Sequence, residues 1–466
     1  MQNHPATPDP VDPGVAPLDA ALVERYAGMA AEASRIDPEF YRIYNVKRGL
    51  RNADGSGVLV GLTTVASVVG YSVLEQEIVP VAGRLLYRGI EIRDIVRGFQ
   101  SEGRFGFEEV CFLLLMGHLP TKDELAEFSA ALDSQRPLPN GFKEDAILGM
   151  PSPDVMNKLA RCVLASYAFD RDPDGTDIPN VLRQSIGLIA RFPTYAVYGY
   201  QAKAHYYLRK SLHMRIPEPG LSTAEHILCL LRPHSRYTKL EAELLDLCLV
   251  LHADHGGGNN STFTTHTVSS TYTDTYSAIA AACLSLKGPR HGGANLEVRK
   301  MMDAVKSHVH DWDSDAEVER YLKRILDKKA YDRRGLIYGL GHAVYTISDP
   351  RAQLLKEKAK MLAEANDRMD EFALYDAIET LGPDIIQQVH PCARDVCANV
   401  DLYSGFVYDM LGIPQDLYTP LFAVGRVVGW CAHRMEELVN GGPIIRPAYK
   451  PVYKWSRPYE PMEARG

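Results

Sequence analysis

Apolar residues recur at helical spacing along most of this chain. From about residue 90 onward they return every three or four positions, which is the pattern of helices that bury one face. Many of these segments begin after Ser, Thr, Asp or Pro and end near Gly, Pro or Asn, as helices do. The pattern predicts helices over residues 18–34, 106–117, 121–133, 154–169, 179–209, 222–230, 237–253, 293–308, 315–328, 351–365, 371–381, 402–411 and 416–439.

The region before residue 90 carries the little β-structure that the sequence predicts. Residues 45–61 include Asn52-Ala-Asp-Gly-Ser-Gly57, a sequence typical of turns, and we expect turns or a short hairpin there. Val79 to Tyr87 is the other candidate strand, and residues 1–18, rich in Pro and Asp, are expected to form a flexible tail. The predicted fold class is therefore mainly α with minor β near the N-terminus.

Two glycine-rich turns, one beside His255 and one beside His291, bracket a segment of helical pattern. This segment requires a break in its helix. A straight helix over residues 261–287 would place its ends roughly 40 Å apart, at ~1.5 Å per residue, so the two turns could not share a site. Residues 269–275, Ser-Ser-Thr-Tyr-Thr-Asp-Thr, favour helix ends because their side chains compete for backbone hydrogen bonds. We predict that Thr273 or Asp274 caps a second helix ending at Gly288-Pro289, and that His255 and His291 come together.

Length, charge and cysteine use exclude several classes of protein. A chain of 466 residues exceeds the size of one compact core, so we expect two domains. The net charge of −8 argues against general binding to nucleic acid or anionic membranes, and no apolar run approaches the ~20 residues of a membrane span. The 8 cysteines lack metal-ligand spacing and the N-terminus resembles no signal or transit peptide, so we expect a cytoplasmic protein with free thiols.

Three stretches carry residues suited to chemistry. They are residues 251–295 with the two glycine turns, Gly339-Leu-Gly-His-Ala-Val-Tyr345 followed by Arg351, and Asn399-Val-Asp-Leu-Tyr-Ser-Gly405 followed by Arg426 and Arg446. Histidine donors polarise a carbonyl or stabilise an enolate, a carboxylate abstracts a carbon-bound proton, and arginine forks bind carboxylates. The sequence contains no nucleophilic Ser or Cys elbow and no Walker phosphate loop. This combination suits a carbonyl reaction on a di- or tricarboxylate.

These motifs resemble those of the citrate synthases. The similar segments are His252-Ala-Asp-His255, Gly288-Pro-Arg-His-Gly-Gly-Ala-Asn295, the 339–345 motif with Asp349-Pro-Arg351, and the 399–405 motif. The resemblance runs from about residue 57 to about residue 450, with the motifs in the family's order. It implies the all-helical two-domain citrate synthase fold, in which residues 1–291 and 396–466 form a large domain and residues 292–395 a small domain that closes over the active site.

The resemblance also implies roles for particular residues. His291 would hydrogen-bond the thioester carbonyl of acetyl-CoA, Asp401 would take the methyl proton, and His342 would polarise the ketone of oxaloacetate and protonate the alkoxide. Hydrolysis of citryl-CoA to citrate and CoA would complete this first step of the tricarboxylic acid cycle, with no cofactor and no metal. The oxaloacetate contacts would fall on His255, Asn259, His342, Arg351, Arg426 and, across a homodimer, the partner subunit's Arg446.

Local sequence supports two of these roles independently. His291 stands just before a helix that Asn295 is expected to cap, and the positive end of a helix dipole disfavours imidazolium. We therefore expect His291 to be a neutral hydrogen-bond donor. Asp401 also opens a predicted helix, whose dipole should keep the carboxylate ionised, as a base must be.

Several positions depart from the family's pattern. Gly256 stands where most members carry Glu, and the glycine run before Asn259 is one residue longer than usual. Ala343 and Thr346 stand where many bacterial members carry Arg and Lys near the CoA phosphates. The candidate replacements, among which the sequence favours none, are Lys328, Lys329, Arg333 and Arg334.

Other functions stay open at this stage. A 2-methylcitrate synthase would use propionyl-CoA with the same residues, since one methylene changes acyl preference by only ~1–3 kcal/mol. The intact His291, His342 and Asp401 argue against a non-catalytic helical binding protein. A metal-dependent hydrolase would need His252, His255 and His266 as ligands, but no carboxylate has the spacing of zinc helices, and we interpret His252 and His266 as structural.

Overall fold

The chain divides into two compact units. The computed structural model describes residues 19–52, 56–74, 77–391, 395–452 and 459–465, and the predicted tail over residues 1–18 lies outside them. One unit comprises Met1–Gly61 with Ile445–Gly466, and the other comprises Leu62–Ile444. The expected domain boundaries at residues 292 and 395 both fall inside the larger unit and remain predictions. Within the described ranges, every helix is too short or too polar to cross a membrane.

The smaller unit contains two short helices and little else. Helix α1 (Ala20–Ala33) confirms the helix predicted over residues 18–34, and Asp19 caps it by accepting the Leu22 amide at 2.9 Å. Helix α2 (Pro38–Ile43), which the apolar spacing did not predict, starts at Asp37 with Pro in its first turn. Over residues 45–61, where turns or a short hairpin were predicted, the described residues show a helical turn η1 (Arg48–Leu50) and an antiparallel bridge between Arg51 and Gly57. A last turn, η5, spans Met462–Ala464.

A three-stranded antiparallel sheet opens the larger unit. Strand β2 (Glu77–Tyr87) confirms the predicted strand, and it pairs with β1 (Ala66–Leu74) and with the short β3 (Ile90–Glu91). Strand β1 was not predicted. A side chain at Gly83 would lie 2.0 Å from the Ser348 carbonyl oxygen, so the sheet closely approaches the loop that follows His342. The sheet therefore supports a loop that carries candidate catalytic residues.

Helices form the remainder of the larger unit. Their number and positions confirm the mainly α class, although α3 and the π-helical turn η2 were not predicted and α15 continues past the expected end at 381. The helices are α3 (Ile92–Ser101), α4 (Phe107–Met116), α5 (Lys122–Gln135), η2 (Lys143–Leu148), α6 (Val155–Ser166), η3 (Tyr167–Phe169), α7 (Ile178–Tyr206), α8 (Thr223–Leu231), α9 (Lys239–His252), α10 (Asn260–Ser269), α11 (Thr275–Lys287), α12 (Ala294–His308), α13 (Asp315–Leu326), α14 (Pro350–Ala365), α15 (Met369–Val389), α16 (Val400–Met410), η4 (Gln415–Leu417) and α17 (Tyr418–Asn440).

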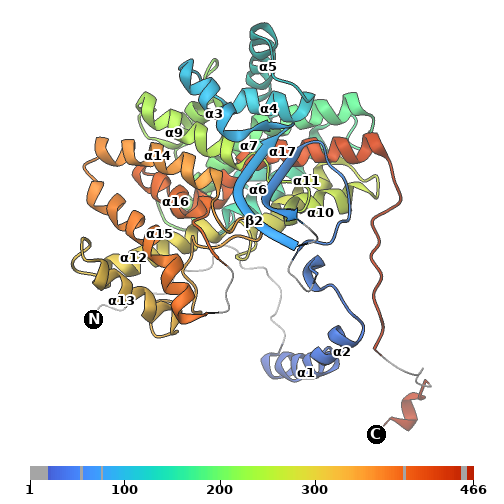
Figure 1. The fold of residues 1–466 in the computed structure, drawn as a ribbon. Coiled ribbons are helices and arrows are strands. Elements are labelled where there is room, and N and C mark those ends of the chain that lie inside the picture. The colour runs from blue at the N-terminus through green and yellow to red at the C-terminus, as the bar shows by residue number, and fades with distance from the viewer. Residues whose placement is uncertain (1–18, 53–55, 75–76, 392–394, 453–458, 466) are drawn as a thin grey trace. The chain divides into compact units, whose positions relative to one another are not determined.

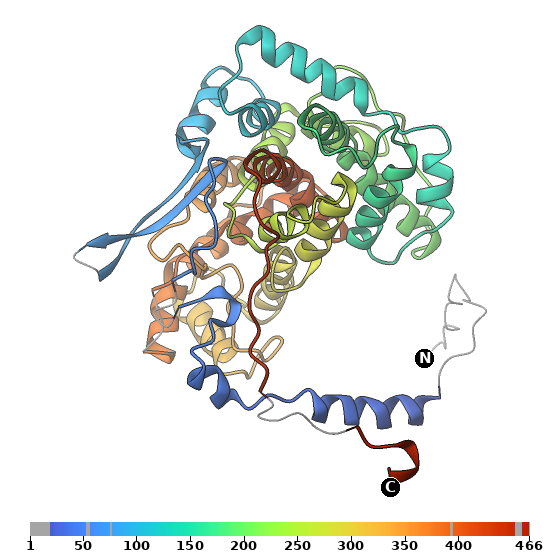
Figure 2. The same ribbon diagram turned by 90° about the vertical axis from the view of Figure 1, so that its right-hand side faces the viewer.

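Helix α17 is the centre of this packing. It is buried along most of its length, and α7, α9, α10 and α11 all pack against it (Figure 1 and Figure 2). A helix enclosed on every side has no solvent face, so its polar side chains must find partners inside the protein. Arg426, His433 and Arg434 are such side chains, each fully buried on α17.

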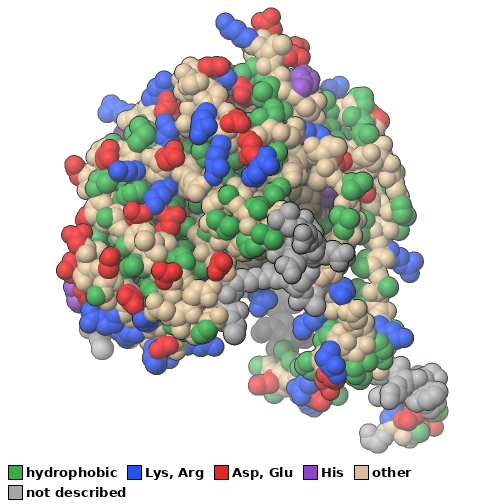
Figure 3. All heavy atoms as spheres, in the orientation of Figure 1, with side chains coloured by type: hydrophobic (Ala, Val, Ile, Leu, Met, Phe, Trp, Pro, Cys, Tyr) green, Lys and Arg blue, Asp and Glu red, His purple; other side chains and the backbone are tan. Residues whose placement is uncertain are grey.

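The surface of the helical layer shows no single sign of charge. Figure 3 shows acidic and basic side chains interspersed over the face in view, with apolar side chains scattered between them. A nucleic-acid-binding surface would instead gather Lys and Arg along one stripe. No such stripe crosses the described residues of the face in view.

Candidate active site

The helix break between the two glycine turns is present. Helix α10 ends at Ser269, and α11 begins at Thr275 with Asp274 as its cap, accepting the Ser277 amide at 2.8 Å. Helix α11 then ends at Lys287, just before Gly288-Pro289, and packs along α10. The chain doubles back, so His291 returns to the start of α10, as predicted.

His291 contacts the first turn of α10. Its Nε2 accepts the Ser261 amide at 3.3 Å and lies 3.1 Å from the Ser261 hydroxyl. Because Nε2 accepts an N–H, the proton of the neutral ring belongs on Nδ1. Burial lowers the pKa of His291 to about 4, with Arg426 adding to the effect, so the ring is neutral at physiological pH. The expectation of a neutral donor thus holds, with burial as its main cause.

The expected cap of the following helix was wrong. The residue that caps α12 is Gly293, and Asn295 lies inside the first turn, fully buried. Neither polar atom of the Asn295 side chain has a hydrogen-bond partner among the described residues. The Gly-Gly pair before Ala294 allows the backbone to start the helix two residues earlier than a side-chain cap at Asn295 would.

His342 lies on the loop between α13 and α14 with a defined tautomer. Its Nδ1 accepts the amides of Val344 at 3.0 Å and Tyr345 at 3.2 Å, which leaves the proton of the neutral ring on Nε2. The ring stacks on Tyr345 at 4.7 Å between centroids and meets His255 edge-on at 5.0 Å. His342 therefore presents an N–H donor beside a second imidazole.

A backbone bridge links this loop to the helix of Asp401. Leu340 and Ala398 form an antiparallel bridge, and the Gly341 amide donates to the Cys397 carbonyl at 2.8 Å. Asn399 caps α16 by accepting the Asp401 amide at 3.0 Å, and its side-chain amide donates to the Gly341 carbonyl at 2.8 Å. These bonds position Asp401 relative to His342, although 58 residues separate Gly341 from Asn399.

Asp401 is a stronger base than its place in the helix suggested. Its Oδ1 is buried and accepts no hydrogen bond from any described residue. Burial raises the pKa of Asp401 to about 6, while Arg351 opposes the rise. The helix dipole favours the ionised carboxylate, but the loss of water around it outweighs the dipole. The carboxylate is still mostly ionised at pH 7 and is more basic than an exposed Asp.

Arg426 is a buried cation, and two of its nitrogen atoms lack hydrogen-bond partners among the described residues. Its Nε donates to the His252 carbonyl at 2.5 Å, but neither Nη1 nor Nη2 has a hydrogen-bond partner in the described part of the chain. Burial lowers the pKa of Arg426 to about 10. An unpaired guanidinium inside a protein is costly unless an anion binds it. Arg426 is therefore a candidate site for a carboxylate.

Two further predicted site residues, Arg351 and His255, are also buried. Arg351, in the first turn of α14, is paired with Asp349 through Nε at 3.0 Å and Nη2 at 2.7 Å. His255 is buried, its Nε2 has no partner among the described residues, and its pKa is lowered well below the usual value by burial and then by Arg351. The neutral His255 ring thus has a free polar atom for a ligand.

Asn259 and Arg446 were also predicted to contact oxaloacetate. Asn259 precedes α10, and its side chain accepts the Ser261 hydroxyl at 2.9 Å, which connects it to His291 through Ser261. Arg446 belongs to the smaller unit, so its role remains a prediction. His252, interpreted as structural, stacks on Phe422 at 4.1 Å, yet neither ring nitrogen has a partner among the described residues.

Two buried side chains that support the His255 turn, Asp254 and His433, were not predicted from the sequence. Asp254 accepts the Gly256 amide at 2.8 Å and lies 3.2 Å from His433 Nε2, and both side chains are fully buried. Burial lowers the pKa of His433, but Asp254 and Glu436 raise it further, to about 9. The only available signal was a histidine in a strongly apolar helix, which does not reveal its partner.

Together these side chains form a site for a carboxylate-bearing substrate and a carbon acid. Neutral imidazoles supply two N–H donors, a basic carboxylate supplies the proton acceptor, and an unpaired guanidinium awaits an anion. Such a combination can polarise a carbonyl, accept a carbon-bound proton and bind a carboxylate.

Comparison with known proteins identifies the family. The family model described as "Citrate synthase, C-terminal domain" matches residues 56–448. The chain is 34% identical over 426 residues to a citrate synthase of Haloferax volcanii, covering 90% of this chain and 99% of that protein. It is 36% identical to one of Deinococcus radiodurans, covering 71% and 81%. The chain belongs to the citrate synthase family.

Solved structures agree with the sequence relatives. A citrate synthase from Thermoplasma acidophilum, in a ternary complex with carboxymethyl coenzyme A and oxaloacetate, is similar with a TM-score of 0.73 and 26% identity, covering 90% of this chain and 99% of that one. The citrate synthase of Pyrobaculum aerophilum has a TM-score of 0.72 and 29% identity, covering 88% and 94%. The protein is an acyltransferase with citrate synthase function.

Proposed function

We propose that His291, Asp401 and His342 carry the condensation of acetyl-CoA with oxaloacetate. Asp401 takes a methyl proton from acetyl-CoA while Nδ1–H of His291 donates to the thioester oxygen. The enol carbon attacks the ketone carbon of oxaloacetate, and Nε2–H of His342 gives its proton to the new alkoxide. Water then cleaves citryl-CoA to citrate and CoA.

The observation that carries this proposal is the ionisation state of two groups: Asp401 is a carboxylate of raised pKa, and His291 is a neutral imidazole. A carboxylate of ordinary basicity is too weak for a carbon acid, and the raised pKa of Asp401, about 6, reduces that mismatch. A charged imidazole at His291 would repel Arg426, and the lowered pKa, about 4, keeps it neutral. Closure of residues 292–395 over the site would exclude the water that competes for these bonds.

We assign oxaloacetate to the group around Arg426. Its unpartnered Nη1 and Nη2 bind one carboxylate, and Arg351 binds the substrate beside its pair with Asp349. His255 and His342 contact the keto acid through Nε2, and Asn259 completes the contacts near His291. The similar Thermoplasma acidophilum enzyme was solved with oxaloacetate, which supports the same ligand here.

We further propose a cytoplasmic homodimer in which the partner subunit's Arg446 reaches the site. No residue of α1 is buried, and Val23, Tyr26 and Met29 are 47%, 54% and 63% exposed. These apolar residues recur every three positions, which is the spacing of a helix face that packs against another protein surface. A second copy of this chain is the partner that would cover them, with no nucleic acid or membrane involved.

Thiol release separates this function from its alternatives. Full-length protein is given oxaloacetate with acetyl-CoA or propionyl-CoA, and free CoA is measured with a thiol reagent. We expect release to require oxaloacetate and to be faster with acetyl-CoA. Faster release with propionyl-CoA would favour 2-methylcitrate synthase, and no release would favour a binding protein. Release without oxaloacetate that chelators abolish would favour a metal-dependent hydrolase.

A further inference from the structure

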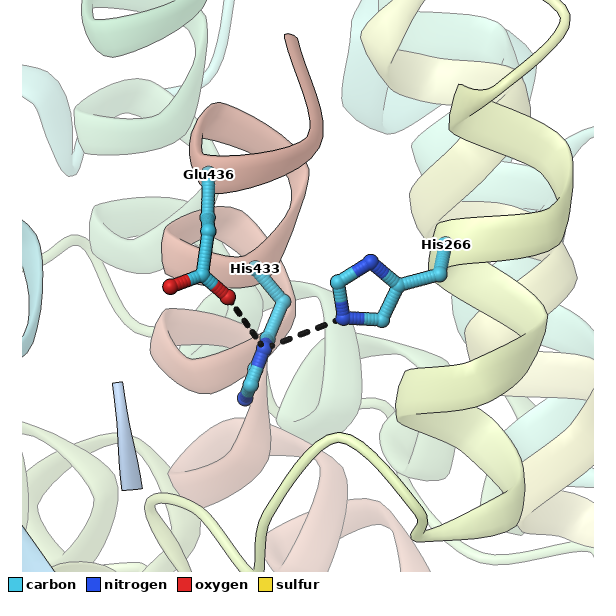
Figure 4. A group of neighbouring side chains, drawn as sticks. All are labelled: His266, His433 and Glu436. Atoms are coloured by element: carbon cyan, nitrogen blue, oxygen red, sulfur yellow. Dashed lines mark hydrogen bonds and ion pairs between the residues drawn. The ribbon is translucent and has the colours of Figure 1, made fainter. Parts of the chain in front are cut away.

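Two histidines far apart in the sequence meet behind the His255 turn. His266 on α10 and His433 on α17 face each other, with Nε2 of the first 3.2 Å from Nδ1 of the second. Figure 4 shows His433 between the His266 ring and the Glu436 carboxylate, whose Oε2 is 3.6 Å from the same Nδ1. The nearest ligand atoms of these three side chains lie within 4.8 Å of one another.

Each histidine is held by a carboxylate on its opposite nitrogen. Nδ1 of His266 lies 2.8 Å from Glu437 Oε2, and Nε2 of His433 lies 3.2 Å from Asp254 Oδ1. A histidine that binds a metal usually donates its other ring N–H to a carboxylate, which fixes the ring and the tautomer. Both histidines have this arrangement, so His266 Nε2 and His433 Nδ1 face the same point. A metal ion bound there would displace the ring proton that the raised pKa of His433, about 9, otherwise retains.

Glu436 is held in place by hydrogen bonds to one of its two carboxylate oxygens. Its Oε1 accepts the Thr64 amide at 2.6 Å and the Thr64 hydroxyl at 2.9 Å. Its Oε2 is buried without a hydrogen-bond partner among the described residues, and the side chain is 10% exposed. A carboxylate oxygen in this position has lost its water, so a cation near it is stabilising.

We propose that His266, His433 and Glu436 bind a divalent ion of the zinc class. Two imidazole nitrogens and a carboxylate oxygen are ligands that Zn²⁺ accepts. Tetrahedral Zn²⁺ at ~2.0–2.2 Å from each ligand places neighbouring ligand atoms roughly 3.3–3.5 Å apart, close to the two measured separations of 3.2 and 3.6 Å. The His266–Glu436 pair, whose ligand atoms lie within 4.8 Å of each other, needs to close by at most roughly 1.5 Å.

The glycine turn lies directly beside the two histidine rings. A Cβ at Gly257 would lie 3.6 Å from His266 Nε2 and 3.9 Å from the His433 ring. The ion would join α10 to α17 on one side of Asp254, whose other bond, to the Gly256 amide, shapes the His255 turn. The ion is therefore structural: it stiffens the support of a substrate-binding histidine and takes no part in the bond-making steps.

The test uses Co²⁺, whose tetrahedral complexes absorb visible light. Full-length protein is stripped with a chelator and titrated with Co²⁺, then with Zn²⁺ as competitor. We expect about one Co²⁺ per chain, a visible spectrum that Zn²⁺ abolishes, and a higher melting temperature with Zn²⁺. If the wild-type protein takes up no Co²⁺, the proposal is wrong, and hydrogen bonds and ion pairs alone hold the cluster together.

Variants locate the ion. His266→Asn and Glu436→Gln should abolish or strongly weaken Co²⁺ binding, and Glu437→Gln, which removes a carboxylate behind the ligand, should weaken it by about 10–100-fold. His213→Asn, at an exposed position, is the matched control and should bind Co²⁺ as the wild type does. Circular dichroism checks that each variant is folded. Unchanged Co²⁺ binding in folded His266→Asn would place the ion elsewhere and refute the site.

Discussion

The side-chain amide of Asn399 donates to the Gly341 carbonyl at 2.8 Å, and its Oδ1 accepts the Asp401 amide at 3.0 Å. One residue thus caps the helix of the proposed base, Asp401, and anchors the loop of the proposed acid, His342. The proposed condensation needs both groups in place at once, so Asn399 is a positioning residue whose loss should separate them.

We expect Asn399→Ala to lower kcat more than it raises the KM for oxaloacetate. Loss of a helix cap costs about 0.5–2 kcal/mol, and a misplacement of about 1 Å in an active site costs on the order of 100-fold in rate. Steady-state kinetics measure both parameters. Asn366→Ala, at an exposed helix end, is the control. An unchanged kcat in Asn399→Ala would show that the bridge does not position the site.

Asp401→Asn should nearly abolish condensation while sparing oxaloacetate binding. The amide is isosteric with the carboxylate but cannot accept the methyl proton, and general-base catalysis contributes about 10²–10⁴-fold. Thiol release gives kcat, and calorimetry gives the dissociation constant of oxaloacetate. Turnover near the wild-type rate would exclude Asp401 as the base.

The pH profile should show the raised pKa of Asp401. The reaction needs the ionised carboxylate, so kcat/KM for acetyl-CoA should fall about tenfold per pH unit below a midpoint near 6. His291, with a pKa of about 4, should not titrate over the same range. A midpoint near 4 would indicate that the Asp401 carboxylate remains hydrated.

The raised pKa of Asp401 also predicts how the stability of the protein depends on pH. The folded protein binds the Asp401 proton more tightly than the unfolded chain, so this contribution to stability is complete below about pH 4 and lost as the pH rises through about 6. At pH 8, Asp401→Asn should therefore raise the free energy of unfolding by on the order of 1–3 kcal/mol. Urea unfolding at pH 4 and pH 8 measures the difference, which should vanish at the lower pH.

Two arginines on α17 should respond in opposite ways to substitution. Arg434 donates to the Thr275 hydroxyl at 3.1 Å, to the Ser269 hydroxyl at 3.1 Å and to the Thr273 carbonyl at 2.6 Å, whereas both Nη atoms of Arg426 lack partners among the described residues. Arg426→Met should raise the KM for oxaloacetate by about 30-fold or more with little loss of melting temperature, since truncating a buried ion-pair partner costs about 2–5 kcal/mol of binding. Arg434→Met should lower the melting temperature instead. A destabilised Arg426→Met with an unchanged KM would contradict the assignment.

Subunit mixing tests the placement of Arg446. If the partner's Arg446 completes each site, a hybrid of Asp401→Asn and Arg446→Ala chains contains one intact site. Random reassociation of equal amounts should then restore roughly a quarter of the wild-type activity, from two inactive parents. If Arg446 serves its own chain, or the protein is a monomer, mixing restores nothing.

The sequence by itself determined the helical architecture and indicated the candidate reacting groups. Apolar spacing and end residues located most helices, because amphipathic periodicity is local information. The hydroxyl-rich stretch around Asp274 indicated the break that returns His291 to α10, because side-chain competition for backbone bonds is also local. Strand β1 was missed, since strand formation depends on a pairing partner elsewhere in the chain. Helix α3 was also missed, although its buried residues Ile92, Ile95, Val96 and Phe99 have helical spacing.

Only the tertiary structure decided how those groups behave. Burial, which no local pattern encodes, raises the pKa of Asp401 against the helix dipole and leaves Arg426 without a partner in the described chain. It also brings His433 of α17 against Asp254 and His266, residues more than 160 positions away in the sequence. Solvation and long-range contacts depend on the whole fold, so the charge state of the site and the cluster behind it emerge only when the helices are packed.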